Sequence, residues 1–129
     1  MARIPDDYLD LFDRRTFAHV ATIDPDGAPH VTPVWIDFDH DSHQILVNTE
    51  RHRRKTRNVE RHPKIGISMI DPDDPYRRLA VTGTVTEITA KGAREHIDRL
   101  SQRYFDKPFQ EEQITSERVL FFVSPDRVY

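Results

Sequence analysis

The short connection Asp24-Pro25-Asp26-Gly27 limits the possible folds more than any other feature, because a run that predicts a β-strand lies on each side of it. Proline suits the second position of a tight turn, and glycine suits a position that requires positive φ. The flanking runs, residues 17–23 and 28–38, are rich in apolar and β-branched side chains. A tight turn between two such runs predicts that the fold begins with an antiparallel hairpin.

Four further runs predict strands, and polar or proline-containing segments separate most of them. Pro29 and Pro33 cannot donate to a strand ladder, so part of the second strand is expected at a sheet edge or a bulge. Gly83 indicates a bulge or a close backbone approach within the fifth strand. The four further runs are residues 44–48, 64–70, 78–88 and 118–124.

Three segments predict helices around these strands. Residues 5–15 begin with a proline and two acidic residues, which suit a helix N-terminus. Residues 91–104 carry apolar side chains at helical spacing. A short helix is expected to end at Arg61, before Pro63. About six strands, joined mostly by hairpins, and these helices together predict a small β-barrel with peripheral helices.

The composition limits the size and the setting of that barrel. A chain of 129 residues predicts one domain, covering residues 1–129. Only 36% of the residues are hydrophobic and 32% are charged, which predicts a small core and favours a dimer that hides a further apolar face. The chain has no apolar run of signal-peptide or bilayer-spanning length, so we expect a cytoplasmic protein with no membrane association.

Several kinds of chemistry are disfavoured by the residues present. The absence of cysteine excludes disulfides, thiolate catalysis and cysteine-ligated metals. The 7 histidines show no helical metal-binding spacing, so no metal site is expected. No nucleophile elbow occurs, and none of the 4 glycines has the spacing of a phosphate-binding loop. Asp71, Asp73 and Asp74 crowd one loop, where they are either solvated or raise one another's pKa by repulsion.

The segment from Asn48 to Asn58 differs from the rest of the chain, because it is strongly basic although the net charge is −3. Forked arginine donors and threonine hydroxyls suit phosphate oxygens, so the segment predicts a bound anion, most simply a phosphate. A solvated helix face is the other main interpretation. A nucleic-acid site with Trp35 or Tyr76 as a stacking platform is disfavoured by the acidic net charge. The cations are Arg51, Arg53, Arg54, Lys55 and Arg57.

The order of the motifs along the chain is also informative. Val34-Trp35 is followed by Arg53-Arg54-Lys55-Thr56-Arg57-Asn58, then by Asp71-Pro72-Asp73-Asp74-Pro75-Tyr76 and Val81-Thr82-Gly83-Thr84-Val85. This order resembles the flavin/deazaflavin oxidoreductase superfamily, whose members share the split β-barrel of pyridoxamine 5'-phosphate oxidase. Within it, the chain is most similar to the small bacterial and archaeal enzymes that use the deazaflavin coenzyme F420.

The resemblance implies a homodimer with two cofactor sites at its interface and a hydride transfer to a small-molecule acceptor with an activated double bond. The cofactor supplies this chemistry, so no catalytic side chain is required. The resemblance assigns ring contacts to residues 34–36 and 48–49, phosphate contacts to residues 53–58, and contacts from the partner subunit to residues 76–78. These residues are Val34, Trp35, Ile36, Asn48, Thr49, Arg53, Arg54, Lys55, Thr56, Arg57, Asn58, Tyr76, Arg77 and Arg78.

Two alternatives to a coenzyme F420 oxidoreductase stay open at this point. The same cleft could hold FMN, although the acidic tail of coenzyme F420 would favour additional cations such as Arg51 and Arg54. The same barrel could also be a non-catalytic binder of haem, a bilin or flavin. Haem would require an axial ligand, for which His19, His52 and His62 are the candidates.

Overall fold

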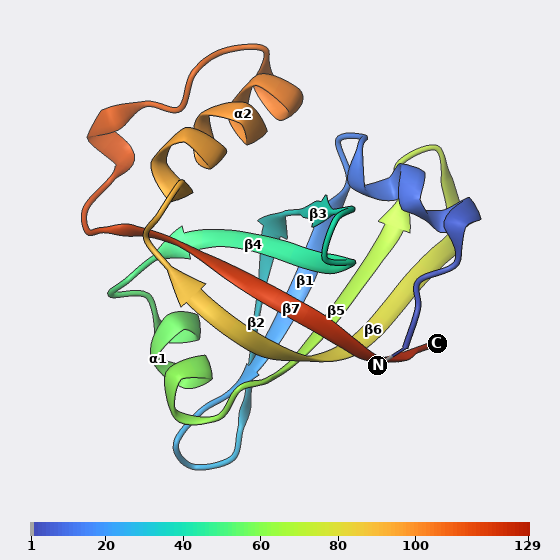
Figure 1. Cartoon of the computed structure of the whole chain (residues 1–129), viewed down its shortest axis with the longest axis horizontal. Helices are drawn as coiled ribbons and strands as arrows, with labels where there is room; N and C mark the ends of the chain where they lie inside the picture. Colours follow the sequence, from blue (N-terminus) through green and yellow to red (C-terminus); the bar gives the residue numbers. More distant parts are fainter. Residues whose placement is uncertain (1) are drawn as a thin grey trace.

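The computed structural model describes residues 2–129, and its seven strands form one antiparallel sheet in the order β2-β1-β5-β6-β7-β4-β3 (Figure 1). The strands are β1 (Phe17–Ile23), β2 (Pro29–Trp35), β3 (Asp37–Asp39), β4 (Gln44–Glu50), β5 (Lys64–Asp71), β6 (Asp74–Thr89) and β7 (Arg118–Val128). The helices are α1 (Arg54–Arg61), α2 (Ala93–Phe105) and the short 3₁₀-helices η1 (Asp6–Phe12) and η2 (Glu111–Gln113).

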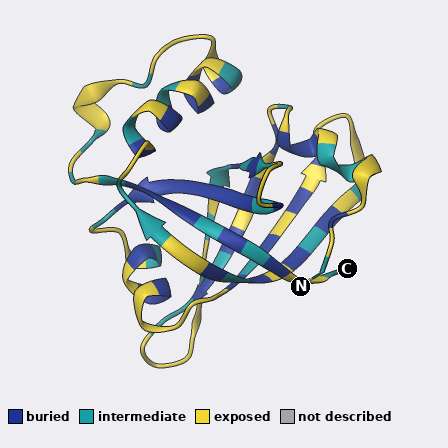
Figure 2. Cartoon of the chain, in the orientation of Figure 1, coloured by how far each residue is buried: buried dark blue, intermediate teal, exposed yellow. Residues whose placement is uncertain are grey.

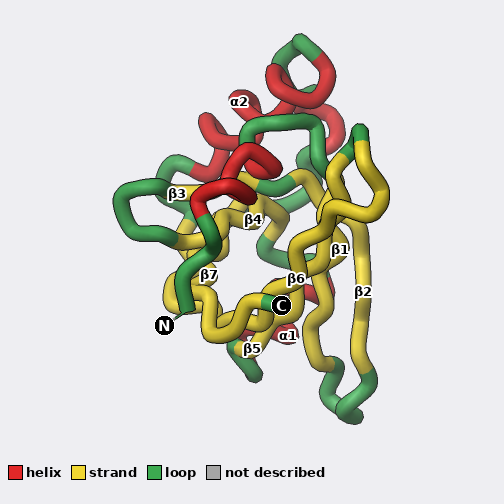
Figure 3. The backbone as a smooth tube through the Cα atoms, turned by 90° about the vertical axis from the view of Figure 1, so that its right-hand side faces the viewer, coloured by secondary structure: helices red, strands yellow, loops and turns green. Residues whose placement is uncertain are grey.

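The junction between β2 and β3 explains why the sheet curls. These strands lie at opposite ends of the sheet, yet Ile36 alone separates them in the chain. The two edges therefore have to meet, and Figure 3 shows the strands arranged around a common interior. Because β2 pairs with β1 and β3 pairs with β4, the barrel is split at this corner. The predicted split β-barrel with peripheral helices is confirmed.

The predicted number of strands was too low by one, because the run predicted as a single strand over residues 28–38 divides at Ile36. The Ile36 N–H donates to the Tyr104 hydroxyl (3.2 Å), and the Ile36 carbonyl accepts from Arg103 Nη1 (2.9 Å). Both backbone groups are thus bonded to α2 and not to a neighbouring strand. The chain turns a corner at this residue, and the predicted strand becomes β2 and β3.

Buried and exposed residues alternate along the strands (Figure 2). In β1, for example, Ala18 and Val20 are buried, whereas Phe17 and His19 face outwards and are exposed. This alternation is the expected pattern of a strand with one face on a core. The largest buried apolar side chains of the core are Phe12, Phe121, Ile4, Leu11, Ile36, Ile45, Met69 and Leu79.

The helices agree with the sequence prediction in position but not in every case in type. The helix predicted for residues 5–15 is the shorter 3₁₀-helix η1, which buries Leu11 and Phe12 in the core. It is closed by tight i→i+3 hydrogen bonds, such as Tyr8 N–H to the Pro5 carbonyl (3.0 Å). The short helix predicted to end at Arg61 is confirmed as α1. None of the helices that the structure describes has the length and apolar character needed to cross a bilayer.

Gly83 lies on β6 at a point where β7 leaves no room for a side chain. The β6–β7 register shifts between Thr82 and Gly83, which confirms the predicted bulge or close approach. A Cβ atom at this position would lie 2.7 Å from the Ser124 carbonyl oxygen and 2.7 Å from Val123 Cγ1. Real Cβ atoms do not come so close, so a side chain here would force the two strands apart.

Replacing Gly83 by alanine is expected to lower the free energy of unfolding by about 1–3 kcal/mol, the usual cost of an overpacked core position. Gly66→Ala is the matched control, because the nearest atom to its added Cβ would be Ala21 Cβ at an ordinary 3.7 Å. Urea denaturation of both variants at one protein concentration measures the difference. Equal stability of the two variants would contradict the close approach at Gly83.

Candidate functional site

A pocket of about 420 Å³ opens at the split corner of the barrel, beside the start of α1. The ends of β2 and β4 form one wall, and α2 and the loop before β7 form the other. Apolar and aromatic residues line the pocket together with three cations, of which two lie at the start of α1 and one at the start of β7. The lining residues are Phe17, Thr32, Pro33, Val34, Trp35, Asn48, Thr49, Arg53, Lys55, Ile97, Phe109 and Arg118.

The basic segment does not act as one surface, because its side chains alternate between two pockets. Arg53 and Lys55 line the corner pocket. Arg54, Arg57 and Asn58 instead line a second hollow of about 550 Å³ beside the β1–β2 turn. The turn's carboxylates lie there too, with Asp24 3.8 Å from Arg54. The structure therefore divides the predicted phosphate-binding residues into two groups.

Of the three cationic side chains that line the corner pocket, Arg118 is paired with Glu50, whereas Arg53 and Lys55 form no ion pair with an acidic residue among residues 2–129. Within residues 2–129, neither side chain lies at ion-pair or hydrogen-bond distance from another group. Burial, followed by the positive charges of Arg53 and Arg118, lowers the pKa of Lys55. An ammonium group that is half-buried beside two guanidinium groups favours a bound anion.

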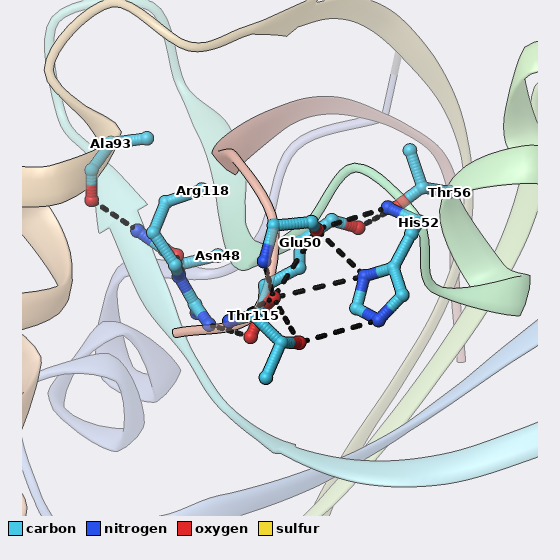
Figure 4. A network of polar contacts seen from close by, with 8 residues as sticks. Asn48, Glu50, His52, Thr56, Ala93, Thr115 and Arg118 are labelled. Carbon is cyan, nitrogen blue, oxygen red and sulfur yellow. Dashed lines mark hydrogen bonds and ion pairs between the residues drawn. The ribbon is translucent and has the colours of Figure 1, made fainter. Parts of the chain in front are cut away.

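Two other members of the basic segment stabilise its position. Thr56 is buried, and its Oγ1 donates to the Glu50 carbonyl oxygen (2.7 Å) at the end of β4 (Figure 4). Asn58 is also buried, and its Nδ2 donates to Thr22 Oγ1 (3.0 Å) and Asp24 Oδ1 (2.9 Å). Thr56 and Asn58 therefore fasten α1 to β4 and to the first hairpin, while Arg53 and Lys55 stay available to the pocket.

Asn48 and Arg118 both line the pocket, and they are hydrogen-bonded to each other (Figure 4). Asn48 Oδ1 accepts hydrogen bonds from Arg118 Nε (3.0 Å) and Nη2 (2.7 Å). The guanidinium carbon of Arg118 lies 5.2 Å from the centre of the Phe109 ring. Burial is the main reason that the pKa of Arg118 is lowered. Arg118 is a pocket residue that the sequence analysis missed.

Glu50 holds the loop that covers the pocket (Figure 4). Its side chain is fully buried, and its Oε1 accepts hydrogen bonds from Thr115 N (3.0 Å), Thr115 Oγ1 (2.9 Å) and Ser116 N (2.6 Å). Burial would raise the pKa of Glu50, but these hydrogen bonds outweigh burial and lower it. Glu50 Oε2 also lies 3.4 Å from Arg118 Nη1. One carboxylate thus joins β4, β7 and the loop that carries Phe109.

Trp35 is held in place by a cluster of aromatic side chains from α2 and the loop that follows it. Its ring stacks on Tyr104 of α2, with ring centres 5.0 Å apart, and lies edge-on to Phe105 and Phe109. Trp35 and Val34 both line the pocket, as does Thr49. Ile36, by contrast, is fully buried in the barrel core. The structure therefore brings four of the five predicted ring-contacting residues to the pocket: Val34, Trp35, Asn48 and Thr49.

Residues 76–78 lie away from the pocket of their own chain. Tyr76 is 86% exposed, and Arg78 is also exposed. Arg77 is bound to Asp10 (2.6 Å) and Asp71 (2.8 Å), which raise its pKa. The pKa of Asp71 is lowered to about 2, first by a hydrogen bond from the Asp73 N–H and then by Arg77. The interpretation of mutual repulsion among the acidic residues is therefore wrong for Asp71.

Several pocket residues carried no recognisable signal in the sequence. Arg118 immediately precedes the apolar run of the last strand, and a cation next to a buried strand was the one available hint. Phe109 lies in a polar segment and reaches the pocket through the fold of the loop. In the part of the chain that the structure describes, no three histidine or acidic side chains are placed where they could together hold a metal ion.

Fold and pocket together define a split-barrel protein with a basic corner pocket. The family profile of pyridoxamine 5'-phosphate oxidase matches residues 4–129, so the chain belongs to that family. An F420H(2)-dependent biliverdin reductase from Mycobacterium tuberculosis is 29% identical over 103 residues, which cover 79% of this chain and 73% of the relative.

Solved structures support the same family. A structure described as F420 reductase is 33% identical, covers 98% of each chain and has a TM-score of 0.85. A haem storage protein, HutZ from Vibrio cholerae, is 17% identical, covers 99% of this chain and 94% of its own, and has a TM-score of 0.63. At that identity the likeness to HutZ concerns the fold alone.

Asp37, the first residue of β3 after the corner at Ile36, has a strongly lowered pKa, from which a pH prediction follows. Burial opposes its charge, but hydrogen bonds from His96 and Arg103 outweigh burial and lower its pKa to about 2 from 3.8. A carboxylate with a lowered pKa stabilises the folded state above its unfolded pKa, and this contribution is lost as the pH falls towards 2.

Asp37→Asn is therefore expected to lower the free energy of unfolding by about 2 kcal/mol at pH 7. The difference from the wild type should shrink between about pH 4 and pH 2, because the wild-type carboxylate becomes protonated there. Urea denaturation at a series of pH values measures it. A difference that stays constant across this range would show that the charge of Asp37 is not responsible.

Proposed function

We propose that this protein is an oxidoreductase that uses reduced coenzyme F420 to transfer a hydride to an organic acceptor with an activated double bond. The observation that carries the proposal is that Arg53 and Lys55, two cations without an acidic partner among residues 2–129, line the same pocket as the partly exposed rings of Trp35 and Phe109. The named functions of the F420-dependent relatives support the same choice of cofactor.

The pocket's electrostatics favour a phosphorylated ligand. No acidic residue is among the lining residues that the structure describes, whereas three cations are. Charge-assisted hydrogen bonds from arginine and lysine to a phosphate are among the stronger polar interactions in proteins. If a phosphate were bound beside Arg53 and Lys55, the ring system attached to it could lie against Val34 and Trp35 in the same pocket.

The chain's own residues would then bind, orient and shield the cofactor. The bound deazaflavin would supply the hydride chemistry, so a catalytic acid or nucleophile is not required. Trp35 and Phe109 would exclude water from the ring. FMN is the alternative cofactor within the family, and its phosphate would meet the same cations.

A haem-binding function receives less support from the site. His52 lies 2.6 Å from Ser116 Oγ and 3.3 Å from Thr115 Oγ1, and His19 is exposed on the outer face of β1. Neither His19, His52 nor His62 is among the described residues that line the corner pocket. We therefore retain haem binding only as an outcome to be tested.

The proposal includes a homodimer that forms through the outer face of β1, β2 and β5. Small residues meet there, since Ala21 of β1 lies opposite Gly66 of β5. Larger apolar side chains at its margin are more than half exposed in the monomer, namely Phe17 and Val31. A face with small residues at its centre and apolar residues at its rim allows two sheets to pack closely. Tyr76 and Arg78 of the partner subunit would then be free to approach the cofactor.

Lys55→Ala is expected to weaken the binding of coenzyme F420 by about 1–3 kcal/mol, the range for a hydrogen bond to a charged group. Arg57→Ala is the matched control, because it removes a cation from the same helix on the side of the second hollow. Fluorescence titration of both variants measures the difference. An unchanged affinity in Lys55→Ala, or an equal loss in Arg57→Ala, would contradict the assignment of the pocket.

The choice of cofactor and activity is tested with the wild-type protein. Parallel titration with coenzyme F420 and FMN should give tighter binding of coenzyme F420. Micromolar binding of FMN without binding of coenzyme F420 would overturn this choice, and a haem spectrum after addition of haemin would support a haem binder. Oxidation of reduced coenzyme F420 in the presence of enones or quinones separates an enzyme from a carrier.

The dimer prediction is tested by Ala21→Arg, which places a charge at the centre of the small-residue face. Sedimentation velocity should show a dimer for the wild type and a monomer for this variant. Gln102→Arg, at an exposed position of α2, is the control and should stay dimeric. A monomeric wild type that still binds the cofactor would rule out a site that needs the partner subunit.

A further inference from the structure

Arg118 differs from the other two cations of the pocket, because its orientation is imposed by the protein. Its side chain is 10% exposed, and two of its nitrogen atoms donate to the single oxygen of Asn48. Arg53 and Lys55 have no such contact within residues 2–129. A guanidinium group that is held in one orientation binds an anion without a further loss of side-chain entropy.

The amide of Asn48 has one orientation that satisfies all its neighbours. Asn48 Nδ2 lies 2.8 Å from the Ala93 carbonyl oxygen and 3.0 Å from His96 Nδ1. A carbonyl oxygen can only accept a hydrogen bond, so the amide nitrogen has to face Ala93 and the amide oxygen has to face Arg118. Since the amide nitrogen can only donate, His96 Nδ1 has to be the unprotonated nitrogen of the ring.

The same reasoning continues from His96 into α2 and β3. With Nδ1 as the acceptor, the proton of the neutral ring lies on Nε2 and is donated to Asp37 Oδ2 (2.9 Å). Asp37 Oδ1 accepts from Arg103 Nη2 (2.9 Å). The His96 side chain is 1% exposed and is not among the described residues that line the pocket. A continuous chain of oriented hydrogen bonds therefore runs from Arg103 to the pocket surface.

We propose that Arg118 is a third phosphate-binding residue of the cofactor site, and that His96, acting through Asn48, is the positioning residue that holds it. This inference rests on the proposed function, because it assigns Arg118 to the same phosphorylated cofactor as Arg53 and Lys55. The charges of Arg53 and Arg118 both act on Lys55, which supports one common anion. Arg118 uses three of its five N–H groups within the protein, since Nε and Nη2 donate to Asn48 and Nη1 donates to Glu50 Oε2 (3.4 Å). Its other N–H groups are free to bind the ligand.

The first test compares coenzyme F420 with its deazaflavin chromophore, which lacks the phosphorylated side chain. Arg118→Gln should lower the affinity for coenzyme F420 by roughly tenfold to a hundredfold, the effect of a lost hydrogen bond to a charged group, and should change the affinity for the chromophore less than about twofold. An equal loss for both ligands would assign Arg118 to the ring or to the fold and overturn the proposal.

The second test is a double-mutant cycle between His96 and Arg118. His96→Phe should weaken binding of coenzyme F420 by roughly threefold to tenfold in the wild-type background, and should have no further effect when Arg118→Gln is already present. His96→Gln should restore most of the affinity, because its amide offers one acceptor and one donor. Equal losses in both backgrounds would show that His96 supports only the fold.

Two controls keep the outcomes distinguishable. Asn48→Leu removes the acceptor of Arg118 and replaces His96→Phe in the cycle if that variant does not fold. Because Asn48 also lines the pocket, only the part of its effect that disappears in the Arg118→Gln background is assigned to the positioning of Arg118. Loss of binding in Lys55→Ala with full binding in Arg118→Gln would reject this inference and retain the proposed function. Failure of the wild type to bind coenzyme F420 or FMN would reject both.

Discussion

The whole arrangement depends on the single residue that connects the two edges of the sheet. Because Ile36 alone links β2 to β3, the end of β2 is forced to lie near β4, although these strands are far apart in the sheet order. The Ile36 N–H and carbonyl are bonded to α2 in place of a strand neighbour. This corner therefore brings Trp35, the β4 residue Asn48 and α2 together, and the pocket forms where they meet.

The basic segment is continuous in the sequence, but the structure directs its cationic side chains to two different pockets. Its cations are nearly continuous along the chain, but the start of α1 turns successive side chains in different directions. Arg53 and Lys55 reach the corner pocket, and Arg54 and Arg57 reach the hollow by the first hairpin. The concentration of positive charge identifies the region of the site, whereas the helix determines which charges can act on one ligand.

The parts of the fold that depend on local pattern could be predicted from the sequence. The first hairpin follows from its turn residues, and the end of α1 at Arg61 follows from Pro63. The corner at Ile36 could not be predicted, since its backbone partners lie on α2, far along the chain. The same is true of Arg118 and Phe109, which reach the pocket only through long-range packing.

The charges of the pocket also explain why a network as extended as the one behind Arg118 is retained. Three neighbouring cations repel one another, and Glu50 compensates only Arg118 directly. A flexible arginine would relieve the repulsion by turning towards solvent, which would remove it from the site. The hydrogen bonds that Arg118 donates to Asn48, which is itself oriented by His96, prevent this movement. The repulsion among the three cations therefore destabilises the folded protein locally. A bound phosphate would relieve this repulsion, and it would bind more tightly because the Arg118 side chain is already in the required orientation.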